Sequence, residues 1–563
     1  MAWAVSKKTL VPVESFGIHS NSGSDRNHNG NNVKAFTRKH HYIVLLVLFA
    51  LVLLPRLNYQ GPYLYNGDPV AYFSGAETML EQGEYLIDGK TPIWPVGTSA
   101  TLVPFIYTAD LFGWNPESSA FWHGVFFIFL AVAFTYLLGK RLFNPATGII
   151  GAVLLAFAES PFIHSVNSAS DPGALAMLIS AIYFIHLFLD TQSPKDLFLS
   201  FFLLGLAFVF RWNYVFFLPL FLVYLVGDRK IWAFHLYPSF WLLGAFGFLI
   251  GILPQLYVNA VHFGNPLKIG YAQLDYSEQF VFNPLVYIKN IVRVVYRVLF
   301  TWDFFSPLLA MFGVLATISL WKEKRRDVFW LFSTWIILGT FSVIYFGVKP
   351  RLLIPIMPPL FLVGAEGLVR TFNALRTTVV FKDVSRNVIV SAFVLMAIIL
   401  FSPMFVRTLL HAHGHYEDKV VMQRAFRWAG KNNKFPEAKI ITQPYYAGQN
   451  DDWLRAGWDV WASKRYSGRK IRSLSFPQSW KDENENWIVI NRFWFEGSNL
   501  RVANSDEIFT RFDSLCIARN MEKKAEFFGR GEPLVLKKLN ILSYYPVDFL
   551  EYRPAFEVWG PAE

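Results

Sequence analysis

The sequence predicts an α-helical integral membrane protein that crosses the bilayer about eleven times and ends in a small soluble α/β domain. Of its 563 residues, 53% are hydrophobic and only 17% are charged, whereas roughly a quarter are charged in soluble domains. The apolar residues form runs, such as 41–54 and 231–261, that approach or exceed the roughly 20 residues of a spanning helix. Most lysines and arginines lie in short loops between these runs, which is typical of polytopic membrane proteins.

The N-terminal segment 1–40 is expected to be a disordered cytoplasmic tail. It is rich in Ser, Asn, Gly and His and contains no apolar run. The first apolar run begins too late for a signal peptide, and no small-residue cleavage site follows it. Lys34, Arg38 and Lys39 precede this run, so the charge rule places the N-terminus in the cytoplasm.

The first span is expected over 41–57, and it delivers the stretch 58–117 to the outer side. This stretch carries seven acidic residues and a single lysine. Its apolar part, 99–114, is short and either spans or lies in the outer interface. The second alternative is favoured because it leaves Lys140 and Arg141 in the cytoplasm.

The remaining spans follow from the same alternation of apolar runs and basic loops. They are expected near 118–139, 145–163, 172–190, 196–211, 213–227, 233–256, 304–321, 328–347, 351–369 and 387–406. The long outer loop 257–303 is expected to form a lid or an amphipathic interface helix. These assignments predict a plasma-membrane protein with a membrane domain over 41–408 and an extracytoplasmic soluble domain over 409–563.

The last 150 or so residues contain no run of membrane length. The segments KIITQPYY, NWIVINRFWF and LVLKKLNIL are typical of strands, and 418–432 and 505–513 of helices. Tryptophans are frequent here. They could stack on an acceptor sugar, or they could form a small core or rest on the bilayer surface.

The net charge of +11 would suggest nucleic acid in a soluble protein. Here the basic residues act as topology signals, so no nucleic-acid partner is expected. The single cysteine, Cys516, excludes a disulfide within the chain and makes a cysteine metal site improbable.

Four ionisable residues near membrane boundaries collect on the outer side: Asp68 in NGDP, Asp171 in SASDPGA, Arg211 in FVFRWNY and Arg351 in KPRLLIP. Charges near hydrocarbon are costly and are therefore functional candidates. Each has a structural alternative. An Asp-Pro pair can cap a helix, and an arginine can anchor a span by reaching toward the interface.

In their order and spacing these segments resemble the GT-C superfamily of membrane glycosyltransferases, which includes protein O-mannosyltransferases, lipid A aminoarabinose transferases and Rgt-type sugar transferases. The resemblance covers roughly 41–370. The segments that carry it are YNGDPVAYFSGAE, SASDPGALAM, GLAFVFRWNYVFFLPL, VHFGNPLKIGY and RLLIPIMPP.

Two positions depart from the family pattern. NGDP carries one acidic residue where the family often has a pair, and Leu352 stands where a tyrosine often follows the arginine. The subfamily therefore stays open. The sequence assigns no cofactor. A divalent metal is not excluded, but the single acidic residue of NGDP does not support one, because such a cation needs several oxygen ligands.

The resemblance implies transfer of a sugar, with inversion, from a dolichyl- or undecaprenyl-phosphate carrier to a glycan, lipid or protein acceptor on the outer face. Asp68 is the expected general base. Arg351 and Arg211, supported by Lys349, are expected to bind the lipid phosphate. Asp171 would orient the acceptor or hold an arginine in place. Tyr72 and Glu77 are further substrate-binding candidates.

Two other classes of membrane protein remain as alternatives. A lipid-linked glycan ligase or flippase would use similar substrates, and a flippase should place arginines along a continuous internal path. A secondary transporter should show paired repeats, broken helices and mid-span charges. The sequence shows no repeat, and its candidate charges gather at one face.

Overall fold

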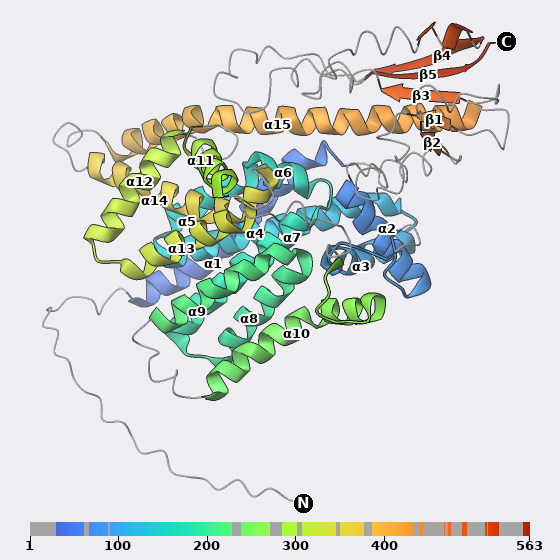
Figure 1. Cartoon of the computed structure of the whole chain (residues 1–563). Helices are drawn as coiled ribbons and strands as arrows, with labels where there is room; N and C mark the ends of the chain where they lie inside the picture. Colours follow the sequence, from blue (N-terminus) through green and yellow to red (C-terminus); the bar gives the residue numbers. More distant parts are fainter. Residues whose placement is uncertain are drawn as a thin grey trace, which may run out of the picture. The chain divides into compact units, whose positions relative to one another are not determined.

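The protein is described by a computed structural model, shown in Figure 1. The structure describes 30–60, 67–87, 91–227, 238–270, 284–300, 307–344, 350–376, 385–432, 440–442, 467, 471–473, 487–491, 513–514, 516–518, 520–528 and 555–562. The chain forms two compact units, 1–47 and 48–563, and helix α1 (Gly30–Leu57) crosses the boundary between them. This helix begins inside the range assigned to the tail. Lysine, alanine and arginine are good helix formers, so a spanning helix can continue into such residues.

The membrane part is a bundle of helices that follow the predicted runs closely. They are α2 (Gly67–Gln82), α3 (Gly97–Leu111), α4 (Ser119–Leu142), α5 (Pro145–Phe157), α6 (Glu159–Ser165), α7 (Ser170–Thr191), α8 (Pro194–Phe210), α9 (Leu218–Gly227), α10 (Pro238–Phe263), α11 (Pro284–Phe300), α12 (Pro307–Lys322), α13 (Arg326–Ile344) and α14 (Met357–Arg376). Short 3₁₀ helices, η1 (Pro116–Ser118), η2 (Trp212–Phe217) and η6 (Pro350–Ile356), precede α4, α9 and α14.

Among the described residues, four helical segments are long and apolar enough to cross a membrane: Pro116–Leu142, Ser170–Thr191, Pro238–Phe263 and Arg351–Leu375. A fifth arises if the bent pair α5 and α6 counts as one span. The protein is therefore an integral membrane protein, while the number of eleven spans stays a prediction.

Local sequence explains where several helices begin. α5, α8, α10, α11 and α12 each start at a proline, whose missing N–H is not needed in the first turn. Asn144 caps α5 because its side chain accepts a hydrogen bond from the Thr147 N–H at 3.0 Å.

Close helix contacts in the bundle depend on residues without a side chain. Between α8 and α10, a Cβ added to Gly205 would lie 2.6 Å from the Phe248 carbonyl oxygen. One added to Gly251 would lie 2.4 Å from the Phe202 carbonyl oxygen. The two helices can approach this closely only because both positions are glycine, as is common between membrane helices.

The expected span 145–163 is bent by 61° between α5 and α6. The buried Arg56 of α1 stabilises this bend. Its guanidinium donates to the Ala156 carbonyl oxygen at 2.8 Å on one side and to Ser165 Oγ at 2.7 Å on the other. Because α6 leads into the start of α7, the bend positions the loop that carries Asp171.

The last span and the first helix of the C-terminal domain are one element. α15 runs from Arg386 to Asn432, so the predicted boundary at 408/409 falls inside a continuous helix. The separate segments 387–406 and 418–432 were predicted because hydrophobicity drops between them. A helix needs no change of backbone conformation when it passes from an apolar to a polar environment, so this drop does not end it.

In the described part of the C-terminal domain, five strands form a mixed sheet in the order β2-β1-β3-β5-β4. Its strands are β1 (Ile440–Thr442), β2 (Ile471–Ser473), β3 (Trp487–Asn491), β4 (Met521–Phe528) and β5 (Ala555–Pro561). β1 is parallel to both of its neighbours, and β5 is antiparallel to both of its own. Apolar residues near the end of α15 form a core with β3 and β5, and Figure 1 shows these strands beside that end.

Two of the three predicted strand segments contain strands, β1 and β3. The third, 534–542, lies outside the described residues, as does 505–512 of the predicted helix. Trp487 is buried in the core with Val489, Phe556 and Val558. This tryptophan therefore follows the core interpretation rather than that of an exposed sugar-stacking surface.

Candidate functional site

Asp171 lies in the first turn of α7 and accepts from two arginines. Its Oδ1 pairs with Nη1 of Arg211, and its Oδ2 accepts from Nε of Arg351 at 2.7 Å. The carboxylate is only 3% exposed, so its two ion pairs are shielded from bulk water.

Asp68 lies in the first turn of α2 and joins the same group of charges. Its Oδ2 pairs with Nη1 of Arg351, and its side chain is 15% exposed. Arg351 therefore bridges the two carboxylates. Four residues predicted from separate segments, Asp68, Asp171, Arg211 and Arg351, meet in one cluster, called here the acid–arginine cluster.

The backbone explains how the arginines reach Asp171. α8 ends at Phe210, and Arg211 follows in an extended conformation at the entrance to η2. The Phe210 ring packs on Gly173, where an added Cβ would lie 2.3 Å from the ring. This contact holds the end of α8 against the start of α7. Arg351 is presented by η6, the 3₁₀ segment just ahead of α14.

Tyr72 lies one turn after Asp68, on the same face of α2. Its hydroxyl donates to Ser170 Oγ at 3.1 Å, and Ser170 precedes Asp171. Because both side chains of this bond are buried, Tyr72 links the two acidic loops. Its hydroxyl thus makes a structural hydrogen bond, and its role as a substrate contact stays a prediction.

One other predicted residue, Glu77, is not part of the cluster in the structure. Glu77 lies nine residues beyond Asp68 on the same helix. This spacing is about half a turn around the helix axis and roughly 13 Å along it, so the side chain leaves on the opposite face from Asp68. Lys349 lies outside the described residues.

The structure adds two residues that no sequence motif indicated. His164 on α6 lies within electrostatic range of Asp171, Arg211 and Arg351, and its Nδ1 donates to the Ser160 carbonyl oxygen at 2.7 Å. Tyr214 of η2 lies within electrostatic range of Asp171 and Arg211. Its buried hydroxyl has no hydrogen-bond partner among the described residues. Only its place three residues after Arg211 could have suggested Tyr214.

The acid–arginine cluster balances two negative against two positive charges. Nη2 of Arg351 is buried and has no hydrogen-bond partner among the described residues. An unsatisfied buried donor is costly. A negatively charged ligand that reached this nitrogen would supply the missing acceptor.

The described residues contain no group of three or more His, Cys, Asp or Glu side chains arranged to hold a metal ion. Asp68 and Asp171, the carboxylates nearest to one another in the site, each pair with a guanidinium.

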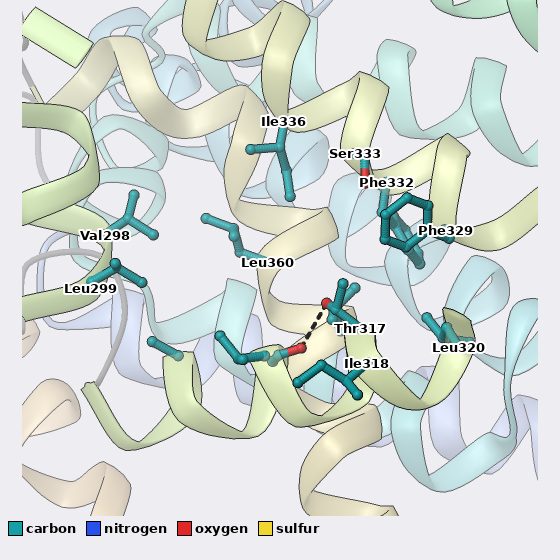
Figure 2. Close-up of a pocket in the computed structure, with 14 residues that line it drawn as sticks. Val298, Leu299, Thr317, Ile318, Leu320, Phe329, Phe332, Ser333, Ile336 and Leu360 are labelled. Atoms are coloured by element: carbon teal, nitrogen blue, oxygen red, sulfur yellow. Dashed lines mark hydrogen bonds between the residues drawn. The ribbon is translucent and has the colours of Figure 1, made fainter. Parts of the chain in front are cut away.

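An apolar cavity of about 230 Å³ lies between α11, α12, α13 and α14. Figure 2 shows its lining, where Thr317 and Ser333 carry the only side-chain oxygens. Thr317 donates its hydroxyl proton to the Gly313 carbonyl oxygen at 2.8 Å, within its own helix. Leu360 of the lining follows Arg351 by nine residues, roughly 15 Å along η6 and α14.

Comparison with known proteins agrees with this architecture. Residues 105–258 match the family model described as dolichyl-phosphate-mannose-protein mannosyltransferase. No curated protein sequence matches the chain.

Two solved structures share the fold. ArnT from Cupriavidus metallidurans, bound to undecaprenyl phosphate, is 14% identical with a TM-score of 0.50, covering 91% of this chain and 97% of its own. The oligosaccharyltransferase AglB from Archaeoglobus fulgidus, in complex with an inhibitory peptide and a dolichol-phosphate, is 13% identical with a TM-score of 0.51. That match covers 81% of this chain and 70% of AglB. The chain thus shares the fold of these two proteins, which confirms the predicted fold class.

Proposed function

We propose that this protein transfers a sugar from a polyprenyl-phosphate carrier to a hydroxyl of a glycan, lipid or protein acceptor at the outer face of the membrane. The observation that carries the proposal is the acid–arginine cluster. In this cluster the partly accessible carboxylate of Asp68 pairs with Arg351, and Nη2 of the same arginine has no hydrogen-bond partner among the described residues. The family match and the two lipid-phosphate-bound structures support the choice of donor.

The two carboxylates have different roles in this proposal. Asp68 is the more exposed and forms an ion pair with one arginine, so it is the general base that takes the acceptor proton. Asp171 is held by two arginines and is almost inaccessible. It therefore positions Arg211 and Arg351, which is one of the two roles expected from the sequence.

The charges of the cluster suit the charges of the reaction. The donor is a phosphodiester with one negative charge, and the lipid phosphate that leaves acquires a second. When Asp68 takes the acceptor proton it becomes neutral, and the charge of Arg351 is no longer compensated. The cluster therefore gains one positive charge at the step in which the leaving phosphate gains one negative charge.

This arrangement favours inversion at the anomeric carbon. A double displacement would need a carboxylate nucleophile in addition to a proton donor and acceptor. Asp171 cannot approach a sugar while both of its oxygens pair with arginines. A single displacement by the acceptor hydroxyl needs only Asp68 as a base.

The carrier's hydrocarbon tail requires an apolar environment within reach of the phosphate. The cavity shown in Figure 2 begins roughly 15 Å along η6 and α14 from Arg351 and has an almost wholly apolar lining.

In the proposed orientation the N-terminus is cytoplasmic and the C-terminal domain is outside. The cluster then lies at the outer boundary of the membrane, and Lys349, two residues before Arg351 in the sequence, is an additional candidate cation.

The direct test supplies purified protein in lipid vesicles with polyprenyl-phosphate sugars and analyses the acceptor fraction by mass spectrometry. Transfer of a sugar, with inverted stereochemistry at the new bond, is the expected result. Movement of intact carrier across the vesicle membrane without any new glycosidic bond would favour a flippase instead.

A further inference from the structure

A buried histidine bonds to two segments of the bundle, one of which is the loop that leads to Asp171. His123 of α4 is 1% exposed. Its Nε2 lies 2.9 Å from Thr101 Oγ1 of α3, and its Nδ1 lies 2.6 Å from Ser168 Oγ in the loop that leads to Asp171. The rings of Phe105 and Phe127 pack against the imidazole from α3 and α4.

The hydrogen bonds of Thr101 decide which nitrogen of His123 carries the proton. The Thr101 hydroxyl donates to the Gly97 carbonyl oxygen at 2.7 Å, so it can only accept from His123. Nε2 of the histidine therefore carries the hydrogen. Burial favours the neutral ring, in which Nδ1 has a free lone pair and accepts from the Ser168 hydroxyl.

Ser168 has an unusual backbone conformation. Its φ is +53°, in the left-handed region that side-chain-bearing residues seldom occupy. The residue is buried, and its side chain bonds to His123 rather than to its own backbone. Such strain persists only where the surroundings determine it, and here the bond to Nδ1 is the restraint.

The two residues between Ser168 and Asp171 are also held by hydrogen bonds. The Ala169 N–H donates to the His164 carbonyl oxygen at 3.1 Å, and Ser170 accepts from Tyr72. On the other side, α4 approaches the end of α6 so closely that a Cβ added to Gly124 would lie 1.8 Å from the Ser165 carbonyl oxygen. This approach brings the neighbouring His123 to the loop.

We propose that His123 is a positioning residue for the transfer reaction. Through Nδ1 it holds Ser168 in the left-handed conformation, and this conformation aims Asp171 at Arg211 and Arg351. The inference rests on the proposed function for its kinetic consequence. The positioning of the loop itself does not depend on that function.

Two isosteric replacements separate the two bonds of His123. Asparagine places its amide oxygen near the position of Nδ1, and glutamine places its amide nitrogen near that of Nε2. His123→Asn can therefore accept from Ser168, whereas His123→Gln can contact only Thr101. We expect kcat to fall about 10- to 100-fold in His123→Gln and by less than about threefold in His123→Asn. A role limited to filling space between Phe105 and Phe127 would make the two variants equal, and that result would overturn the proposal.

A second pair of variants tests the strain at Ser168. Glycine adopts a positive φ without strain, so Ser168→Gly loses the hydroxyl but keeps access to the loop conformation. Ser168→Ala loses the hydroxyl and retains the strain. We expect kcat to fall further in Ser168→Ala than in Ser168→Gly. Normal kcat in Ser168→Ala would contradict the proposed restraint.

Amide hydrogen exchange over 163–171 gives a readout that is independent of activity. Exchange should be faster than in the wild type in His123→Gln and Ser168→Ala, and close to wild type in His123→Asn. If the wild-type protein transfers no sugar, the proposed function fails while this exchange pattern still decides the positioning role. If it transfers sugar and exchange is unchanged in every variant, the positioning role fails and the proposed function stands.

Discussion

Among the described residues, two arginines each bridge a pair of carboxylates, one just ahead of α14 and one near its end. The two bridges differ in whether a hydrogen-bond donor of the arginine is left without a partner. Arg351 joins Asp68 to Asp171. Arg370 joins Glu366 to Glu323. The chemical groups are the same and the two arginines are about equally exposed, at 26% and 25%. The difference therefore lies in the exposure of their carboxylates and in the remaining hydrogen-bond capacity.

The bridge at Arg370 is saturated and open to solvent. Its Nε donates to Glu366 at 2.6 Å, and its two Nη atoms both donate to Glu323, which is 47% exposed. Glu366 also accepts from Thr147 at 2.7 Å. Every group has its partner, so this bridge ties the end of α12 and the start of α5 to α14 and does not need a ligand.

The bridge at Arg351 is incomplete, and its carboxylates are less exposed than Glu323, at 3% for Asp171 and 15% for Asp68. Its Nη2 has no partner among the described residues, and Asp171 is nearly inaccessible to water. Burial strengthens the attraction between such groups and also raises the cost of any donor left unsatisfied. A bridged arginine therefore indicates a binding site when a buried donor remains, and a structural clamp when none does.

The largest expected effect is the all-or-none response of accessibility reporters, which tests which end of α14 faces the outside of the membrane. Accessibility reporters at 140, 229 and 325 should be cytoplasmic, because basic residues cluster in those loops. A reporter at the C-terminus should be extracytoplasmic. A cytoplasmic C-terminus would place the two bridges on the opposite sides from those proposed.

Next in size is the effect of Asp68→Asn. We expect the transfer rate to fall about 10²- to 10⁴-fold, since a neutral amide cannot accept the acceptor proton. Donor binding should change little, because asparagine keeps the size of the side chain. A near-normal rate would show that Asp68 only pairs with Arg351 at the start of α2, and Asp171→Asn would then be the next variant to assay.

Replacing each of the two arginines with lysine tests the difference between the two bridges directly. Arg351→Lys keeps a positive charge but loses the planar fork that reaches both carboxylates and a phosphate, so donor turnover should fall roughly 100-fold. Arg370→Lys should leave turnover within about twofold. Steady-state kinetics with a polyprenyl-phosphate sugar measures both. Equal losses in the two variants would remove the distinction between site and clamp.

The smallest effect concerns the stability that Glu323 contributes. Its hydrogen bond to Arg370 lowers its pKa below the usual value, so its stabilising effect is present above the unfolded-state pKa and is lost as pH falls through the lower folded-state pKa. The group is largely exposed, and solvent screening limits the contribution to under about 1 kcal/mol.

Glu323→Gln should therefore lower the thermal midpoint slightly at neutral pH and not at all in strong acid. The measurement is a thermal unfolding series in detergent at several pH values, with Glu526→Gln in the C-terminal domain as an exposed control. A loss that grows toward low pH would contradict the assigned sign.

The sequence by itself determined the fold class, the expected order of the spans and the four charged residues of the site. Long apolar runs have few alternatives to spanning helices, because every backbone polar group must be bonded inside a bilayer. Charges next to such runs stand out for the same reason. Asp68, Asp171, Arg211 and Arg351 could thus be selected without knowledge of their contacts.

Only the tertiary structure decided which of these charges meet and what holds them. Asp171 lies 40 residues from Arg211 and 180 from Arg351, and no local pattern encodes a pairing over such distances. His123 and Ser168 belong to no recognisable sequence motif. Their proposed roles arise only because α4 lies close to the loop that leads to Asp171. Glu77 lies on the face of α2 opposite Asp68, which nearness in sequence did not reveal, and its role as a substrate contact stays a prediction.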